Sequence, residues 1–442
     1  MEKITSAKLA QILGCTADKI VDVVIDNVST DSRKITPTSL FIALKGERFD
    51  AHNFVKEVIS AGCPLVVVER LLDDVPSERQ LVVEDTLQAF GKIGAYNRSL
   101  FTGTVIGLTG SAGKTTTKEE IAFLLSKFAP VYATGGNHNN AVGVPQSLCE
   151  MDMKASYAVI EMGMSAKGEI SYLTNLVKPD IAVITNVYPM HIEFFENFEG
   201  IAGAKAEIFE SMSKNGVAVI NEDTNFASLL KETAFKYTHN IKTFGKNNHP
   251  QAKFTTQEEG EQYEYNAWCA LRVVEILGLD VQKAASYIKD FGALEGRGKR
   301  HTLSLSDGSY TLIDDSYSGQ PEAMIMAINN LSKMQTKGRK IAVLGKMAEL
   351  GETSRERHKE VGRVLAQSNV DIVVGVCPET KDMLAQLPVD KEQYYFASKD
   401  GIAEFLLNKL LQNGDTILIK GARYSSQVYK ITEELIKRGE MQ

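Results

Sequence analysis

The sequence of 442 residues has few cysteines, no long apolar run and no excess of positive charge. Its five cysteines are odd in number, far apart and without metal-like spacing, which argues against a disulfide framework or a zinc site. We expect reduced, mostly buried thiols in a cytoplasmic protein. No apolar stretch approaches the roughly 18–20 residues of a membrane span, and the first residues lack a signal peptide's apolar segment.

The charge balance argues against another class of protein. The net charge is −7 at pH 7, whereas a protein that binds nucleic acid broadly needs a basic face. Local Lys and Arg side chains and helix N-termini can still bind an anionic ligand. The composition, 43% hydrophobic and 24% charged, is typical of globular domains, and the length suggests about three of them at roughly 150 residues each.

Apolar runs that alternate with helical patterns predict an α/β fold in three parts. Strands are expected at 39–44 and 63–69 in the first part, and at 310–313, 340–344, 372–375 and 416–420 in the last. In the central part, strands at 104–108, 157–161, 181–186 and 216–221 alternate with helices, which predicts a mostly parallel sheet. Ligands of such sheets bind beyond the carboxyl ends of the strands.

The strongest functional signal is the segment 109–117, Thr-Gly-Ser-Ala-Gly-Lys-Thr-Thr-Thr. It lies between a predicted strand and a predicted helix at 118–128, which is the layout of a phosphate-binding loop. Gly110 and Gly113 allow the main chain to turn its N–H groups toward phosphate oxygens. Lys114 adds a positive charge, and a Thr hydroxyl can hold Mg²⁺. The loop is shorter than a full Walker A motif, because position 108 is Leu rather than Gly.

Polar residues follow the neighbouring strands of this sheet. Glu161 is placed either to coordinate Mg²⁺ or to face solvent at a strand end. His191 is either a structural histidine or a ligand for metal or substrate. Lys205 lies in a helical pattern and is interpreted as a surface residue. The cluster Asn137–Asn140 is in its simplest interpretation an Asn-rich turn.

A basic turn marks the boundary between the second and third parts. Glycines flank Arg297, Lys299 and Arg300. This basic turn is either a solvated linker or a turn that places a positive side chain over the transferred phosphate. Asp314 and Asp315 follow the next predicted strand. They are placed either to hold ribose hydroxyls or to cap a helix.

Ten segments along nearly the whole chain resemble the Mur ligase family. They are 31–34, 40–52, 109–117, 136–145, 161–165, 191–193, 204–208, 296–301, 314–317 and 344–351. Any one is modest evidence, but ten in family order are specific. The resemblance implies a small N-terminal α/β domain that binds a UDP-linked substrate (1–98), a central P-loop-type parallel-sheet ATPase domain (99–295) and a C-terminal Rossmann-like ligase domain (296–442).

The resemblance also implies an ATP-dependent amide ligase of peptidoglycan precursor synthesis. The branch with the greatest similarity adds D-alanyl-D-alanine to UDP-N-acetylmuramoyl-tripeptide. ATP phosphorylates the peptide carboxylate to an acyl phosphate, and the amine of the dipeptide then displaces phosphate. Phosphorylation supplies the leaving group that an ionised carboxylate lacks. The implied cofactors are ATP and Mg²⁺, and we expect a cytoplasmic monomer without nucleic-acid partners.

Residue roles carried over from the family complete this hypothesis. Nucleotide contacts are assigned to Gly110, Ser111, Ala112, Gly113, Lys114, Thr115, Thr116, Asn266, Arg297 and Asp315. Metal contacts are assigned to Thr115, Glu161, His191 and Lys205, the last as a carbamate formed with CO₂. Catalytic roles fall to Lys114, His191, Lys205 and Arg297. Substrate contacts are assigned to Ser29, Asp31, Ser32, Arg33, Lys45, Gly46, Asp50, His52, Asn137, Asn139, Asn140 and Ser165.

Several positions depart from the family pattern. Lys346 stands where Asp is usual, Ala166 follows Ser165 where His is common, and the segment between 245 and 266 is short. The phosphate-binding residues are retained. Two alternatives therefore accompany the main hypothesis: a ligase of the same build with another amine or acid, and a nucleotide-binding protein that no longer ligates.

Overall fold

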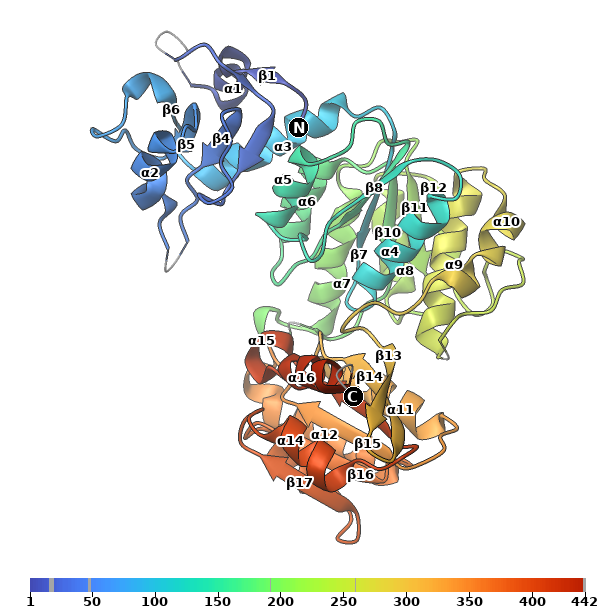
Figure 1. Cartoon of the computed structure of the whole chain (residues 1–442). Helices are drawn as coiled ribbons and strands as arrows, with labels where there is room; N and C mark the ends of the chain where they lie inside the picture. Colours follow the sequence, from blue (N-terminus) through green and yellow to red (C-terminus); the bar gives the residue numbers. More distant parts are fainter. Residues whose placement is uncertain (16–19, 47–48, 191, 259, 440–442) are drawn as a thin grey trace. The chain divides into compact units, whose positions relative to one another are not determined.

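The computed structural model describes residues 1–15, 20–46, 49–190, 192–258 and 260–439. The chain forms two compact units (Figure 1). The first comprises Met1–Val187, Ala202–Ala252 and Trp268–Ala285, and the second comprises Tyr188–Ile201, Lys253–Ala267 and Ser286–Gln442. The N-terminal and central sheets belong to the first unit, and the C-terminal sheet belongs to the second.

The N-terminal part of the first unit is a small parallel sheet of order β3-β4-β5-β6. Its strands are β3 (Asn27–Ser29), β4 (Ser39–Ile42), β5 (Leu65–Val68) and β6 (Gln80–Val82), and β1 (Ile4–Thr5) pairs antiparallel with β2 (Val24–Ile25) beside it. Its short helices are α1 (Ser6–Leu13), η1 (Ala51–Phe54) and α2 (Val55–Ser60). Every residue of β4 and β5 is buried, as expected for parallel strands covered on both faces, and both predicted strands are confirmed.

Helix α3 (Thr86–Leu100) connects this sheet to the central one. The Asp85 carboxylate caps its first turn by accepting the N–H of Leu87 at 2.7 Å. At Gly94, a Cβ atom would lie 3.0 Å from the carbonyl oxygen of Pro145, so glycine permits α3 to pack closely on α5 (Gly143–Cys149). Asn97 donates a buried hydrogen bond across the same contact. This packing explains why the two sheets fall into one unit.

The central sheet has the order β12-β11-β10-β7-β9-β8, and every neighbouring pair is parallel. Its strands are β7 (Thr104–Thr109), β8 (Val131–Ala133), β9 (Tyr157–Glu161), β10 (Ile181–Ile184), β11 (Val217–Asn221) and β12 (Asn240–Phe244). Its helices are α4 (Lys114–Leu125), α6 (Glu169–Val177), α7 (Phe198–Ala206), α8 (Ala227–Phe235), α9 (Glu261–Ile276) and α10 (Val281–Ser286). The four predicted strands form the middle of the sheet, and the two edge strands were not predicted.

The C-terminal sheet has the order β13-β14-β18-β15-β16-β17, with one antiparallel pair, β13–β14, at its edge. The strands are β13 (Lys299–Leu305), β14 (Gly308–Asp315), β15 (Lys340–Gly345), β16 (Ile372–Val376), β17 (Glu392–Phe396) and β18 (Thr416–Lys420). The helices are α11 (Pro321–Lys333), α12 (Ser354–Gln367), α13 (Thr380–Leu384), α14 (Ile402–Phe405), α15 (Arg423–Ser426) and α16 (Tyr429–Gly439). Two apolar clusters include side chains from alternate positions of these strands.

Two expectations about local structure are corrected. The predicted helix at 118–128 begins earlier, at Lys114, because Gly113 takes a left-handed conformation (φ 75°) at its N-cap. The basic run at 296–300 is only partly a turn, since Lys299 and Arg300 already belong to β13. Among the described residues, none of the helices is both long and apolar enough to cross a bilayer.

Candidate active site

The loop between β7 and α4 has a conformation that only glycine allows at one key position. Gly110 has φ 156°, and a Cβ atom there would lie 1.9 Å from the Thr185 hydroxyl oxygen. Gly113 begins α4 without a side-chain cap, and the first N–H groups of a helix have no acceptor within the helix itself. Such a helix start favours an anion, because its backbone N–H groups and the positive end of the helix dipole both face the ligand.

The end of β10 holds this loop in place. The N–H of Ser111 donates to the backbone oxygen of Asn186 at 3.0 Å, and that of Ala112 donates to its side-chain oxygen at 2.8 Å. The Thr185 hydroxyl donates to the Ala112 carbonyl at 2.9 Å. The backbone donors of Ser111 and Ala112 are therefore committed to the protein. A phosphate group would rely on the donors that follow, at the start of α4.

Two lysines lie near each other beside the loop. Lys114 donates to the Gly110 carbonyl at 2.9 Å. Lys205, near the end of α7, is only 2% exposed. Burial lowers the pKa of Lys205 well below its usual value, and the Lys114 ammonium lowers it further. The interpretation of Lys205 as a surface residue is therefore wrong, and its amine is neutral over a much wider pH range than an exposed lysine.

Glu161 ends β9 in a buried position and is 1% exposed, so the alternative of a solvent-facing carboxylate is wrong. Its Oε1 accepts a hydrogen bond from the Asn139 side chain at 2.7 Å. Its Oε2 is buried and has no hydrogen-bond partner among the described residues. A buried carboxylate oxygen left without a donor is costly, and a bound cation would remove that cost. Asn139 is itself fixed, since its carbonyl accepts the Gly163 N–H at 2.7 Å.

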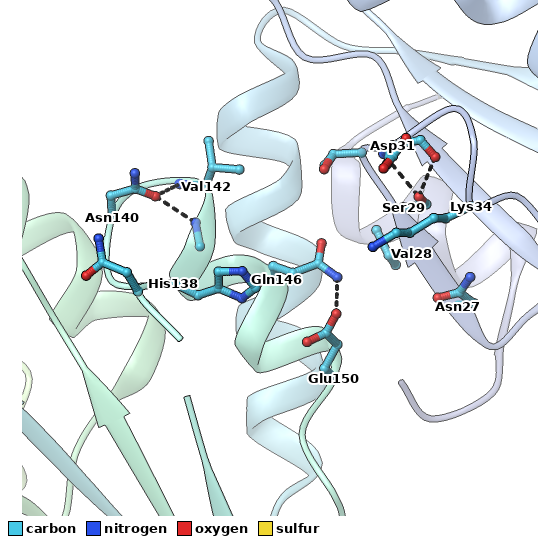
Figure 2. A pocket seen from close by; sticks show the side chains of 13 residues that line it. Asn27, Val28, Ser29, Asp31, Lys34, His138, Asn140, Val142, Gln146 and Glu150 are labelled. Carbon is cyan, nitrogen blue, oxygen red and sulfur yellow. Dashed lines mark hydrogen bonds between the residues drawn. The ribbon is translucent and has the colours of Figure 1, made fainter. Parts of the chain in front are cut away.

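A cavity of about 510 Å³ lies within the first unit, between the N-terminal sheet and the start of α5 (Figure 2). One wall is formed by residues 27–31 and Lys34, and the other by residues from the segment 137–150. Four predicted substrate residues line it: Ser29, Asp31, Asn137 and Asn140. Asn140 also accepts the Gly143 N–H at 2.8 Å, so the Asn-rich turn both shapes the cavity and starts α5.

Other predicted substrate residues interact locally outside this lining. The exposed Arg33 side chain pairs with Asp31 through two hydrogen bonds of 2.8 Å and lowers the pKa of Asp31 to about 2. His52 is buried; its Nδ1 contacts the Asp50 carboxylate at 2.5 Å, and its Nε2 accepts the Glu69 N–H at 2.9 Å. Nδ1 therefore carries the proton, and His52 orients Asp50. Lys45 and Gly46 precede Asp50, and Lys45 pairs with it in a short β-bridge.

The carboxyl edge of the C-terminal sheet, in the second unit, carries a different set of charges. Asp315 pairs with the buried Lys420 at 2.8 Å across β14 and β18. Burial raises the pKa of Asp315, and the Lys420 ammonium opposes that rise without cancelling it. Asp314 accepts the N–H of Gly296 and the hydroxyl of Ser316, so it fixes the basic turn rather than a helix start.

That basic turn presents Arg297. Its guanidinium packs on the ring of Tyr317, 4.2 Å from the centroid. Of the other two basic residues, Lys299 pairs with Glu295 and Arg300 pairs with Glu258 at 2.7 Å. Within the part of the chain that the structure describes, Arg297 therefore packs on an aromatic ring, whereas the other two basic residues pair with carboxylates.

Comparison with known proteins identifies three matching segments of the chain. Family models match over 24–96 (Mur ligase family, catalytic domain), 108–277 (Mur ligase middle domain) and 299–423 (Mur ligase, glutamate ligase domain). The UDP-N-acetylmuramoyl-tripeptide–D-alanyl-D-alanine ligase of Escherichia coli K12 is 33% identical, over 99% of this chain and all of that protein.

The chain belongs to the Mur ligase family. Solved Mur ligases agree with this over their full length. A MurF crystal structure from Acinetobacter baumannii has a TM-score of 0.88 at 32% identity, with 99% of each chain covered. A MurF ligase from Thermotoga maritima in complex with ADP has a TM-score of 0.80 at 29% identity, covering 94% of this chain and 98% of that one.

The structure brings only part of the predicted Mur ligase site together. The loop 110–116, Glu161, Asn139 and Lys205 lie in the first unit, as does the cavity, whereas Asn266, Arg297 and Asp315 belong to the second. Ser165 lies after Glu161, and its N–H donates to the Glu169 carboxylate at 2.7 Å. His191 lies outside the described residues.

Sequence reasoning missed several supporting residues. Thr185 and Asn186 hold the loop, Lys420 neutralises Asp315, and a second arginine, Arg423, contacts Tyr317 at 5.5 Å from the ring centroid. Asn186 was detectable, since it ends a predicted strand parallel to the one that enters the loop. Lys346, which departs from the family pattern, pairs with Glu379 at 3.1 Å.

Proposed function

We propose that this Mur ligase joins D-alanyl-D-alanine to UDP-N-acetylmuramoyl-tripeptide, with ATP converted to ADP and phosphate through an acyl phosphate. The observation that carries the proposal is the glycine loop before α4, whose uncapped helix start and Lys114 offer donors and charge for a triphosphate. The names of the full-length relatives supply the two substrates. The ADP complex of the Thermotoga maritima relative supports the nucleotide.

In this proposal, Mg²⁺ is held by Glu161 and Thr115, together with His191 and Lys205. The buried Oε2 of Glu161 fits such a role, because it lacks any donor among the described residues. Oxygen ligands are those that Mg²⁺ prefers. Bound there, the ion would offset the charge that grows on the transferred phosphoryl group. Asn139 would hold the other Glu161 oxygen, so that the carboxylate keeps one orientation.

Lys205 is proposed to carry a carbamate. Its buried, easily deprotonated amine is the form that attacks CO₂: a C–N bond forms, one C=O π bond becomes a carboxylate oxygen, and the amine loses a proton. The product replaces a buried cation with an anion. Two problems are relieved together, because the repulsion from Lys114 becomes attraction and the metal gains an oxygen ligand.

The cavity in the first unit is proposed to receive part of the UDP-linked substrate, with residues 1–98 as its binding domain. Amide side chains from Asn27, Asn137, Asn140 and Gln146 line it beside Ser29 and Lys34, which suits a ligand rich in hydroxyl, amide and anionic groups. Asn139 shares a turn with this lining and contacts Glu161, so the turn connects the cavity to the proposed metal ligand. The activated carboxylate would lie at that end.

The remaining nucleotide contacts are proposed for the second unit, from Asn266, Arg297 and Asp315. Arg297 would stabilise charge on the transferred phosphoryl group, and Asp315 would bind ribose hydroxyls. The proposed domain limits are 99–295 for ATP binding and 296–442 for the C-terminal domain.

A substrate panel tests this function directly. The purified protein is supplied with ATP, Mg²⁺, bicarbonate and UDP-N-acetylmuramoyl-tripeptide, and phosphate release is measured with D-alanyl-D-alanine, other dipeptides and single amino acids. We expect release to require both the tripeptide and an amine, with D-alanyl-D-alanine preferred and the ligated product seen by mass spectrometry. A clear preference for another amine would reassign the substrate, and no release with any amine would reject the function.

A further inference from the structure

A buried lysine that has no role in the proposed function lies in α4, one helical turn after Lys114. The Lys118 side chain is fully buried, and its ammonium donates to the carbonyl oxygen of Thr134, just after β8. Its carboxylate partner is Glu119, at 2.8 Å. An ammonium is costly to bury, whereas an apolar side chain would fill the same interior space without that cost. The presence of this lysine inside the domain points to a role for its bond to Thr134.

That bond lies where the ladder between β8 and β9 ends. Thr134 follows the last residue of β8, and its N–H donates to the Val159 carbonyl at 3.0 Å, as in a regular parallel ladder. The next bond of such a ladder would run from the Glu161 N–H to the Thr134 carbonyl. The Glu161 N–H is instead accepted by the Thr134 hydroxyl at 3.1 Å, and the carbonyl accepts the Lys118 ammonium. Lys118 thus takes the carbonyl out of the ladder, and the hydroxyl of the same residue replaces it.

The end of this ladder allows Asn139 to reach Glu161. If β8 continued in its register with β9, Asn139 would lie opposite Ser165. That position is four residues past Glu161, which is about 13 Å along the strand. The chain instead turns at Gly136, which has φ 51°, and the Asn139 side chain donates to the Glu161 Oε1 at 2.7 Å. The segment that Lys118 diverts therefore holds both the main chain and the side chain of Glu161.

We infer that Lys118 and Thr134 are positioning residues for Glu161 as a metal ligand. This inference rests on the proposed function, which places Mg²⁺ at Glu161. Thr134 fixes the main chain of Glu161 at the sheet edge, and Lys118 ties the same point to α4, whose first turn follows the glycine loop. The metal ligand and the donors for the triphosphate thus share one support. A Glu161 without that support would bind the ion less tightly.

The test measures metal binding to the full-length protein without turnover. Mn²⁺, which also prefers oxygen ligands, is the probe, and its EPR signal reports the free ion. Glu161→Gln defines the part of the binding that depends on this carboxylate. Thr134→Val removes the acceptor of the Glu161 N–H with little change in shape, and it should raise the Kd of that part by about 10-fold. Thr134→Ser retains the hydroxyl and should bind Mn²⁺ as the wild type does, whereas Lys118→Met should weaken binding about as much as Thr134→Val.

Thr238→Val is the matched control. Thr238 is buried beside β12, at the opposite edge of the same sheet. Its hydroxyl also accepts a backbone N–H, that of Asn240 at 3.1 Å, and donates to a carbonyl, that of Gly216 at 2.6 Å. The two valine variants should therefore lower the urea midpoint to similar extents, but only Thr134→Val should weaken Mn²⁺ binding. A merely structural role of Thr134 would not separate them.

Three results would overturn the inference. They are a Mn²⁺ affinity of Thr134→Val equal to that of the wild type, an equal loss of affinity in Thr238→Val, and a Thr134→Ser variant as weak as Thr134→Val. A Glu161→Gln variant that binds Mn²⁺ like the wild type would refute the proposed metal site itself, and the inference with it. That outcome is recognised before any threonine variant is made.

Discussion

The carboxyl edges of the central and C-terminal sheets differ in how their charges are balanced. At the central edge, Glu161 has a buried oxygen without a donor, and the buried Lys205 has no carboxylate partner among the described residues. At the C-terminal edge, the buried charge of Lys420 is matched by Asp315, and the arginines lie on aromatic rings. Both edges belong to parallel strands, where ligands commonly bind.

This difference shows at which edge the buried charged groups lack partners. Unbalanced buried groups are costly, which supports the proposal of a bound cation and a carbamylated lysine at the central edge. At the C-terminal edge the buried ammonium is already paired, and two half-buried arginines offer donors to an anion. The first edge therefore fits the proposed metal and triphosphate, and the second fits an anionic group.

Of the changes at either edge, removing Lys114 should have the largest effect on phosphate release. Lys114→Ala deletes the charge beside the proposed triphosphate, so phosphate release should fall by about a thousandfold or more. The unfolding midpoint should change little, because the lysine ammonium donates to the Gly110 and Ser111 carbonyls of its own loop. Steady-state assays and thermal unfolding measure the two effects. Near-normal turnover would remove the loop from the mechanism.

Lys205→Ala should reduce phosphate release by about a hundredfold, because the variant cannot carry the proposed anion. Short carboxylic acids added to the assay should restore part of the activity by supplying oxygen ligands at the vacated position. Lys118→Ala is not a suitable control, because that lysine donates to the Thr134 carbonyl. Lys214→Ala is the control, because Lys214 is exposed. Full activity without added acid would contradict the carbamate.

At the C-terminal edge, Asp315→Asn should act on stability as well as on turnover. The change leaves the Lys420 ammonium buried without its partner, so the free energy of unfolding should fall by about 3 kcal/mol. Urea unfolding measures this loss. The double variant Asp315→Asn, Lys420→Met should recover most of it, since both charges are then gone. A single variant as stable as the wild type would show that this pair does not hold the edge together.

An effect on stability alone, without a large change in turnover, is expected for Glu120, which is buried in α4, farther along the helix from the loop. Burial raises the pKa of Glu120 from 4.5 to about 8. The native carboxyl thus keeps its proton while the unfolded one ionises, so its contribution to stability is full below pH 4.5 and is lost as pH rises toward 8. Gln cannot ionise, so between pH 5 and pH 8 the free energy of unfolding of Glu120→Gln should fall by a few kcal/mol less than that of the wild type. Unfolding measured at both pH values gives this difference. Parallel pH profiles would contradict the assignment.

Much of the fold could be predicted because buried parallel strands form continuous apolar runs. The strand Ile181–Ile184, in the middle of the central sheet, has no polar residue, whereas the edge strand Asn240–Phe244 alternates exposed and half-buried positions before its buried last residue and was missed. Edge strands need fewer apolar side chains, since one side faces solvent. Their sequence signal is correspondingly weak.

The loop could be predicted because its chemistry is local, whereas its surroundings depend on contacts distant in sequence. The Asn139–Glu161 bond spans 22 residues, and the bond from the Ala112 N–H to Asn186 spans 74. The burial of Lys205 follows from how α7 packs, and the helical pattern alone suggested the opposite. Only the resemblance to Mur ligases indicated a metal-site role for this lysine.

The central claim is that the glycine loop directs phosphoryl transfer to the peptide carboxylate. The most direct test uses UDP-N-acetylmuramoyl-tripeptide with its terminal carboxylate labelled with oxygen-18, ATP and D-alanyl-D-alanine, and measures the label in the released phosphate. The account predicts one labelled oxygen in each phosphate, because that oxygen leaves with the phosphoryl group when the amide forms. Phosphate without label would contradict it.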